Sequence, residues 1–430
     1  MGRSTRKREF EVKNRPPIRR DTKKKEVNFN TMTNLKRQII AIVAATSLVM
    51  PNMAYAATTL TVSGNGSESE NKVELLNSKS TTVVQSNDAK VENNISSSST
   101  TGGNRANDNV GGEVMIRTGD ASTDTTVTNM LNSNKATVGC CNEGDVEALI
   151  TGNGHDSENE IEIKSGYKDA TEIFQDNNAY GKNNVDSTSS TGKNDANRNT
   201  GADVKVVTGD AATTTSVSTT ANVNEAKVGG SHNEEGALSA VIAGNGSDSE
   251  NDIELKLGKD TSVVQDNYAK VHNYVDAYAK TGENDANDNT GGDVAIVTGD
   301  ASSDILVDNL VNFNAADIDC GCLTDLEAKI AMNGADSENE IEAYLGGDLG
   351  VFQGGKEGDG NKAELKNNVD GNAKTGLNDS DFNTGYEGSD PYIWTGDAWS
   401  GTEVSNAGNV NVFGNWGEIE WPTFEWSFSL

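Results

Sequence analysis

Apolar and polar residues alternate along most of the chain. The stretch from 82 to 91 shows the pattern, and the side chains expected to share one face of a strand there are Val83, Gln85, Asn87, Ala89 and Val91. Alternation with a period of two is typical of β-strands, and clusters of Asn, Asp and Gly separate the alternating runs. No stretch shows helical periodicity with caps. The sequence therefore predicts an all-β region over residues 57–388.

The alternating runs recur with a long period. The tripeptide Thr-Gly-Asp begins at Thr118, Thr208, Thr298 and Thr395, at spacings of 90, 90 and 97 residues. A glutamine within a strand recurs at Gln85, Gln175, Gln265 and Gln353, at spacings of 90, 90 and 88 residues. Self-similarity at a fixed period is the signature of a repeat architecture. We expect four repeats of about 90 residues.

A shorter period lies inside the long one. Spacings of 22, 22, 23 and 21 residues separate Asn245, Asn267, Asn289, Asn312 and Asn333. We expect each long repeat to hold four rungs of about 22 residues in a narrow β-solenoid, with Asn and Gln of successive rungs bonded into ladders. About 16 rungs at roughly 4.8 Å each would form a rod roughly 75 Å long.

The alternative fold is a row of four immunoglobulin-like β-sandwiches. A repeat of 90 residues is close to the size of such a domain. Each sandwich would need its own bulky core, but the second repeat contains Phe174 as its only Phe and has no Trp. A 22-residue period is also not expected of a sandwich, so the solenoid is favoured.

Residues 1–56 resemble a basic extension followed by an export signal. The apolar run Ile39–Met50 is 12 residues long, too short to span a bilayer comfortably. Ala54-Tyr55-Ala56 follows it and matches a signal-peptidase site. We expect cleavage after Ala56 and a secreted or cell-surface mature chain. Met1 and Met32 both remain candidate start residues.

The charge balance limits the partners. The chain has 35 basic and 66 acidic residues, and residues 1–56 hold 13 and 4 of them. The remainder therefore carries 22 basic and 62 acidic residues, a net charge of −40. Such a chain does not attract nucleic acid or anionic lipid, whereas it attracts cations. No later apolar run is long enough for a transmembrane helix.

One acidic turn has the composition of a calcium site. Asp285, Asn287, Asn289 and Asp293 place carboxylate and amide oxygens near one Gly-containing turn, as Ca²⁺ sites do. The competing interpretation is that Asn and Asp close the turn by bonding their own backbone. No Glu closes the loop as in an EF-hand. Ca²⁺ is therefore the only candidate cofactor, and no cofactor is the simpler expectation.

The four cysteines form two pairs, Cys140 with Cys141 and Cys320 with Cys322. In a solenoid of 22-residue rungs, the pairs would lie roughly 40 Å apart, too far for a disulfide between them. Three interpretations stay open, and the first two are a local bridge in each pair and a cross-link between neighbouring molecules. Metal binding by the thiols is the third.

Residues 389–430 contain all five Trp of the chain. Phe424, Trp426, Phe428 and Leu430 alternate with other residues near the end of this segment, which favours a strand that buries one face. The residues of the predicted interaction tail are Trp416, Trp421, Phe424, Trp426 and Phe428. Such a strand would cap the open end of a solenoid. Alternatively it would dock on the next subunit or on a surface component.

The sequence resembles one known family. The motif V-V-Q-x-N-x-A-x-V, at Val83 and again at Val263, is similar to the curlin-type repeats of secreted bacterial fibres. The resemblance implies a secreted, stacking protein without enzymatic activity. The three His residues occupy unrelated positions in the repeat, and no hydrolase or phosphate-loop motif occurs.

These observations predict a secreted structural or adhesive protein of the cell surface or extracellular matrix, with a self-associating fibre subunit as the most specific form. Its partners would be further copies or a surface component. The alternative is a tandem immunoglobulin-like adhesin, stiffened by Ca²⁺, that binds a surface ligand. An extracellular hydrolase is the third hypothesis.

Overall fold

The computed structural model describes residues 47–49, 58–139, 145–201, 203–229, 237–319, 326–354, 360–386 and 389–414 of the chain. All of them belong to one compact unit, Val43–Leu430. Every regular element among them is a β-strand, which confirms the prediction of an all-β chain. No helix in these ranges is long and apolar enough to cross a membrane.

The chain winds through four successive coils, where a coil is one passage around the stack. The first contains β2 (Thr58–Ser63), β3 (Glu70–Asn77), β4 (Thr81–Thr100), β5 (Val114–Arg117) and β6 (Ala121–Val138). The second contains β7 (Val146–Thr151), β8 (Glu158–Ser190), β9 (Val204–Val207) and β10 (Ala211–Gly229). The third contains β11 (Leu238–Ala243), β12 (Glu250–Lys280), β13 (Val294–Val297) and β14 (Ala301–Asp319). The fourth contains β15 (Leu326–Ala331), β16 (Glu338–Leu345), β17 (Leu349–Gln353), β18 (Lys362–Lys374), β19 (Tyr392–Trp394) and β20 (Ala398–Phe413).

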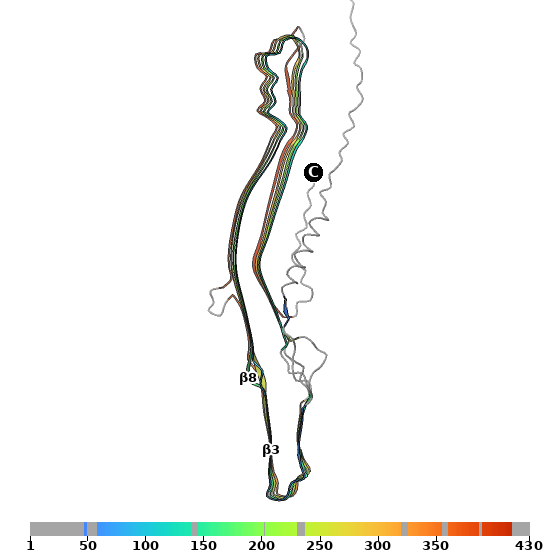
Figure 1. Ribbon diagram of the computed structural model, residues 1–430, viewed down its shortest axis with the longest axis vertical. Helices are drawn as coiled ribbons and strands as arrows, with labels where there is room; N and C mark the ends of the chain where they lie inside the picture. Colours follow the sequence, from blue (N-terminus) through green and yellow to red (C-terminus); the bar gives the residue numbers. More distant parts are fainter. Residues whose placement is uncertain are drawn as a thin grey trace, which may run out of the picture. The chain divides into compact units, whose positions relative to one another are not determined.

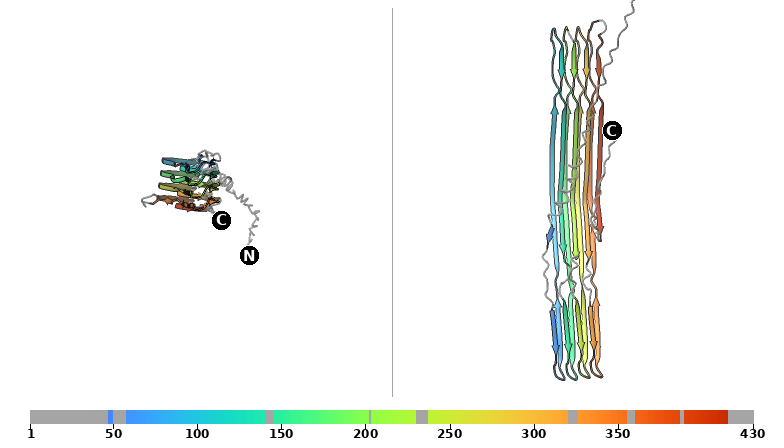
Figure 2. Two further views of the ribbon diagram at one scale, coloured as in Figure 1. Left: turned by 90° about the horizontal axis from the view of Figure 1, so that it is seen from below. Right: turned by 90° about the vertical axis from the view of Figure 1, so that its right-hand side faces the viewer.

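Each strand pairs with its counterpart in the next coil. Ala211 of β10 pairs with Ala121 on one side and with Ala301 on the other, at an offset of 90 residues each way. The offset reaches 97 between Ala301 and Ala398 and falls to 88 between Thr58 and Val146. Figure 2 shows the resulting rows of strands side by side, and all four sheets run from the first coil to the fourth.

The prediction of 22-residue rungs is wrong, because one coil of this solenoid-like stack takes about 90 residues. Asn245 and Asn289 lie in the turns before and after β12, at its two ends. Asn267 and Asn312 lie in strands of two different sheets, β12 and β14. The short period therefore marks four places around one coil. Figure 1 shows the stack along its axis, and in this view the coils superimpose.

The proportions also differ from the predicted rod. Four coils span three inter-strand steps, or roughly 14 Å, along the stacking direction. The 33 residues of β8 alone extend roughly 110 Å at right angles to it. The stack is thus wide along its strands and thin along its axis.

The alternative of tandem immunoglobulin-like sandwiches is contradicted. Such a sandwich consists of antiparallel sheets formed within one repeat. Here every pair of described strands is parallel, and the partners come from successive repeats. No repeat can complete its own sheet.

Two walls face each other across a narrow core. β3, β4, β8, β12 and β16–β18 form one wall, and the strands of the other three sheets form the opposite one. Apolar clusters recur along the whole coil. The clusters at its two ends include Ile150, Ile161, Ile242 and Ile253 at one end and Val204, Val206, Val294 and Ile296 at the other, and further clusters lie between them. Alternation sets this burial, and in β4 the odd-numbered side chains from 83 to 91 are the more buried ones, as expected.

The predicted boundary at residue 388 falls inside the fourth coil, because β19 pairs with β13 and β20 pairs with β14. Of the predicted export signal, only β1 (Ser47–Val49) is described, and it pairs with Lys135–Thr137 of β6. The aromatic residues predicted to form an interaction tail, from Trp416 to Phe428, lie outside the described residues.

Candidate assembly surfaces and the ladders that end on them

Asparagine side chains form hydrogen-bonded ladders along the stack. Asn71 donates from Nδ2 to Oδ1 of Asn159 at 2.9 Å, Asn159 donates to Asn251 at 3.0 Å, and Asn251 donates to Asn339 at 3.0 Å. Parallel in-register pairing places each Asn directly beside its counterpart, about 4.8 Å away, which suits such ladders. In this ladder the donor always belongs to the coil nearer the N-terminus.

Further ladders join the two walls. Nδ2 of Asn177 on β8 donates to Asn224 on β10 at 2.7 Å and to Asn267 of the next coil at 3.1 Å. Asn183 receives a bond from Asn129 across the core at 2.9 Å and donates to Asn273 at 2.7 Å. Asn177 and Asn183 are fully buried. A buried polar core stabilises a fold only when its groups are hydrogen-bonded, and these ladders meet that need.

The glutamine ladder has the opposite direction. Gln175 donates from Nε2 to Gln85 at 2.8 Å, Gln265 donates to Gln175 at 2.8 Å, and Gln353 donates to Gln265 at 3.0 Å. Each donor here belongs to the coil nearer the C-terminus. The Asn and Gln ladders together therefore give the stack a chemical polarity.

The Thr-Gly-Asp tripeptides are stacking turns. The backbone N–H of Gly209 donates to Oγ1 of Thr118 at 3.1 Å, and that of Asp210 donates to Oδ1 of Asp120 at 3.0 Å. A Cβ on Gly209 would overlap the backbone of Gly119 in the coil before it. The motif recurs because each coil must approach the previous one closely at this turn.

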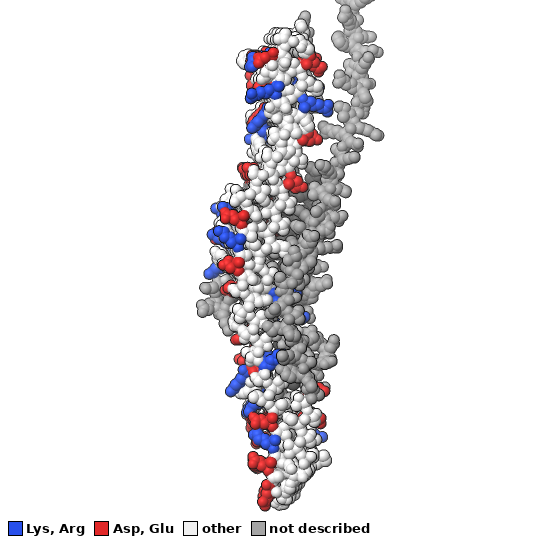
Figure 3. All heavy atoms as spheres, in the orientation of Figure 1, with Lys and Arg blue, Asp and Glu red and all other residues white. Residues whose placement is uncertain are grey.

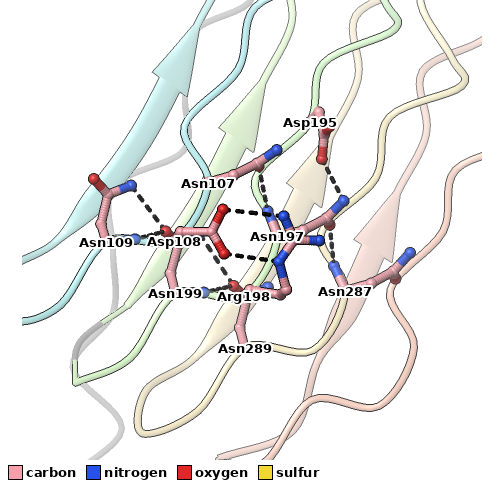
Figure 4. Close-up of polar contacts among 9 residues, drawn as sticks. All are labelled: Asn107, Asp108, Asn109, Asp195, Asn197, Arg198, Asn199, Asn287 and Asn289. Carbon is pink, nitrogen blue, oxygen red and sulfur yellow. Dashed lines mark hydrogen bonds and ion pairs between the residues drawn. The ribbon is translucent and has the colours of Figure 1, made fainter.

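The candidate calcium residues take part in the same stacking, and Figure 4 shows two of them, Asn287 and Asn289. Oδ1 of Asn287 accepts a bond from the backbone N–H of Asp381 at 2.6 Å, and Oδ1 of Asn289 accepts one from that of Asn199 at 2.8 Å. Asp293 donates its backbone N–H to Asp203. In the part of the chain that is described, no three His, Cys, Asp or Glu residues lie close enough together to hold a metal ion.

Asp285 belongs to a column of carboxylates, where a column is the set of residues that pair with one another in successive coils. It pairs with Asp195 on one side and with Asp379 on the other. Burial, followed by the charges of these two neighbours, raises the pKa of Asp285. In the neighbouring column, Arg198 binds both carboxylate oxygens of Asp108, at 2.7 and 3.0 Å, and this lowers the pKa of Asp108. Acidic turns of this chain therefore combine repulsion in one column with pairing in another.

Cys140, Cys141, Cys320 and Cys322 lie outside the described residues. The strands that lead to them are described, and the ends of these strands lie closer together than a solenoid of 22-residue rungs would place them. Val138 pairs with Val228, which pairs with Ile318. The two strand ends are therefore two steps apart, or roughly 10 Å, rather than roughly 40 Å.

The stack ends in two open faces. The N-terminal face consists of the outer edges of β2–β6, and β1 pairs with only three residues of it. The C-terminal face consists of the outer edges of β15–β20, which no other described strand pairs. Unpaired strand edges are templates for a further strand. These faces are the candidate functional surfaces.

The charged residues on these faces were not predicted from the sequence. They include Lys72, Lys90 and Arg105 on the first coil and Glu340, Glu364 and Asp379 on the fourth. Comparing the first repeat with the fourth, column by column, would have found them. Lys, Arg, Asp and Glu side chains gather mainly along one margin in the view of Figure 3.

Comparison of the chain with protein-family models, curated proteins and solved structures found no match.

Proposed function

We propose that this protein is a secreted structural subunit that self-associates through its open faces into a fibre of the cell surface or extracellular matrix. The observation that supports this proposal most directly is the pair of open faces. The first and the fourth coil form the two ends of the stack. Each of them presents a nearly continuous edge of backbone N–H and C=O groups. Natural sheet proteins usually shorten or cover such edges.

The cross-section also favours continued stacking. Each step inside the chain is held by backbone pairing over most of a coil and by Asn and Gln ladders. A second copy added to an open face would form the same contacts again. Such extended cross-β pairing gives fibres high stability.

Export is part of the proposal. Cleavage after Ala56 would remove β1 and uncover Lys135–Thr137 of β6. The edge of the first coil would then be open along all its strands, so assembly would be favoured after removal of the leader. The resemblance to curlin-type repeats supports the same class of function.

Electron microscopy and fibre diffraction test the proposal. We expect the purified chain, with its N-terminus determined by mass spectrometry, to form unbranched fibres at high concentration. The fibres should show a meridional reflection near 4.8 Å, the spacing of strands along the stack. Monodisperse monomers in sedimentation velocity at the highest soluble concentration would contradict the proposal.

A further inference from the structure

We infer that copies of this chain join head to tail, with the fourth coil of one copy docked in register on the first coil of the next. The inference rests on the proposed function and specifies its partner, a second copy, as well as its polarity. Three independent features of the two faces support this arrangement. They are the unused ends of the ladders, the glycines that would face the next copy, and the charges.

The ladder ends match only when unlike faces meet. In the part of the chain that is described, Oε1 of Gln353 has no donor, whereas Oε1 of the buried Gln265 accepts a bond from Gln353. Among the described residues, Gln85 donates only to the carbonyl of Lys135, at 3.1 Å, whereas Gln175 donates to a glutamine as well. Gln85 of the next copy would supply the missing donor. Two like faces would instead bring donor to donor or acceptor to acceptor.

The Asn ladders require the same polarity. Nδ2 of Asn251 donates to Asn339, whereas the only acceptor for Nδ2 of Asn339 within the described residues is the carbonyl of Ser337, at 3.4 Å. The acceptor that continues this ladder is Oδ1 of Asn71 in the next copy, because Asn71 begins the same column. Both kinds of ladder are therefore completed by one docking direction.

Glycines lie on the open faces where the isolated chain leaves space. A Cβ on Gly282 would overlap the carbonyl oxygen of Gly376 in the fourth coil. A Cβ on Gly376, in the same column, would meet nothing within 4 Å. On the N-terminal face, Gly66 and Gly119 are equally unobstructed, although their counterparts inside the stack cannot carry a Cβ. A docked copy would create the same close approach at these three positions.

Charge is complementary in three columns. The column that begins with Lys72 ends with Glu340, the one that begins with Lys90 ends with Glu364, and the one that begins with Arg105 ends with Asp379. In a fourth column the signs are reversed, because Glu92 begins it and Lys366 ends it.

Side chains in these columns do reach one coil across. Lys72 binds Glu160 at 2.8 Å, and Lys270 binds Glu364 at 2.9 Å. Head-to-tail docking therefore brings each of the four pairs within ionic contact.

Some columns bring like charges together. The column from Glu70 to Glu338 contains Glu in all four coils, and the one from Asp120 to Asp397 contains Asp in all four. Both repulsions already occur at each step inside the chain, so docking adds one more step of the same kind. The four complementary columns distinguish the correct docking from a symmetric one, in which each face would meet its own charges.

Charge-reversed variants test the inference. The N-face variant carries Lys72→Glu, Lys90→Glu and Arg105→Glu, and the C-face variant carries Glu340→Lys, Glu364→Lys and Asp379→Lys. We expect each variant alone to elongate at least about tenfold more slowly than the wild type, because three attractions become repulsions. An equimolar mixture should elongate again, since each reversed face meets its reversed partner and each native face meets a native one. Mixing changes no contact within either chain, so this rescue reports only on contacts between copies.

A matched control has Lys168→Glu, Lys193→Glu and Lys205→Glu, all in the second coil away from both faces. It has the same net charge as the N-face variant and should elongate alone. Normal growth of either face variant alone would overturn the inference, and so would a mixture that fails to grow while the wild type and the control do. In both cases the fibre function would stand. A wild-type chain that never assembles would overturn the inference together with the proposed function.

Gly376→Ala gives a second test that does not depend on charge. Its melting temperature should match that of the wild type, because no atom of the described residues lies within 4 Å of the added methyl group. Added in small amounts to growing wild-type fibres, it should dock by its first coil and stop elongation, because its fourth coil is blocked. Elongation that continues at the wild-type rate would overturn the inference.

Discussion

The inner coils and the outer coils of this stack contain nearly the same residues in very different surroundings. Ile253 of the third coil is fully buried, whereas its partner in the same column, Ile341 of the fourth coil, is 46% exposed. Gln265 is fully buried and bonded on both sides, whereas Gln353 is bonded on one side only. The two residues are identical in both of these comparisons, so the difference in burial comes from the number of neighbouring coils.

This contrast shows where the stability of the molecule lies. The inner coils bury side chains that the fourth coil leaves partly exposed, as expected of a repeat protein in which each unit contacts its neighbours alone. Stability therefore resides in the contacts between coils. The outer coils have half of these contacts and are the parts that a further copy would complete.

The largest expected difference between inner and outer coils concerns the apolar core. We expect Ile253→Ala to lower the free energy of unfolding by about 2–5 kcal/mol, because it leaves a cavity in a fully buried site. Ile341→Ala, in the same column, should cost less than about 1 kcal/mol in the monomer. Denaturant unfolding of both variants under monomeric conditions measures the contrast. Equal losses would show that the fourth coil is already buried in solution.

The buried glutamine ladder should show a smaller contrast. Gln265→Leu removes the oxygen that accepts a bond from Gln353 and the N–H group that donates to Gln175. We expect the free energy of unfolding to fall by about 1–3 kcal/mol, because the buried Gln175 loses a hydrogen-bond partner. Gln353→Leu removes a single step at the open face and should cost less. Urea unfolding of the two variants gives the comparison, and a larger loss for Gln353→Leu would reverse the assigned roles of inner and outer coils.

A small, pH-dependent gain is expected from Asp285→Asn. Burial and the charges of Asp195 and Asp379 raise the pKa of Asp285, so its ionised form opposes folding. A carboxyl group whose pKa is raised in the folded state makes the protein more stable as the pH falls through that pKa toward its ordinary value of 3.8. The variant should therefore melt about 1–2 °C higher than the wild type at pH 7, with the gain vanishing below about pH 4.

The control is Asp88→Asn, which makes the same change of charge at an exposed position of the first coil. It should leave the melting temperature nearly unchanged at both pH values. If the gain of Asp285→Asn persists at low pH, repulsion within the carboxylate column is not its cause.

The smallest expected effect is that of a chelator. Oδ1 of Asn287 and Oδ1 of Asn289 accept backbone N–H groups of neighbouring coils. We therefore expect EDTA to change the melting temperature by less than about 1 °C, measured with and without added Ca²⁺. A fall of several degrees that Ca²⁺ restores would assign a cation to the turn from Asp285 to Asp293.

Alignment of the repeats could have predicted more of the candidate surfaces than the motifs did. The charges at Lys72 and Glu340 are visible in the sequence, but their relation depends on knowing that the residues share a column. With rungs of 22 residues, Lys72 and Glu340 would not be expected at equivalent positions of the two ends. The same holds for the glycines of the open faces. The sequence shows Gly376, but only the close packing of Gly282 against the fourth coil shows that a docked copy would leave no space for a side chain at Gly376.

The sequence by itself determined the strand character and the 90-residue period, because alternation selects β-structure locally and self-similarity is independent of folding. It also indicated the polar ladders, since Asn and Gln recur on inward-facing positions. Only the tertiary structure decided which period is the stacking distance. Asn residues spaced by about 22 can mark four short rungs or four places around one long coil, and both interpretations satisfy every local preference. The choice depends on which strands exchange backbone hydrogen bonds, and those bonds join residues one long repeat apart.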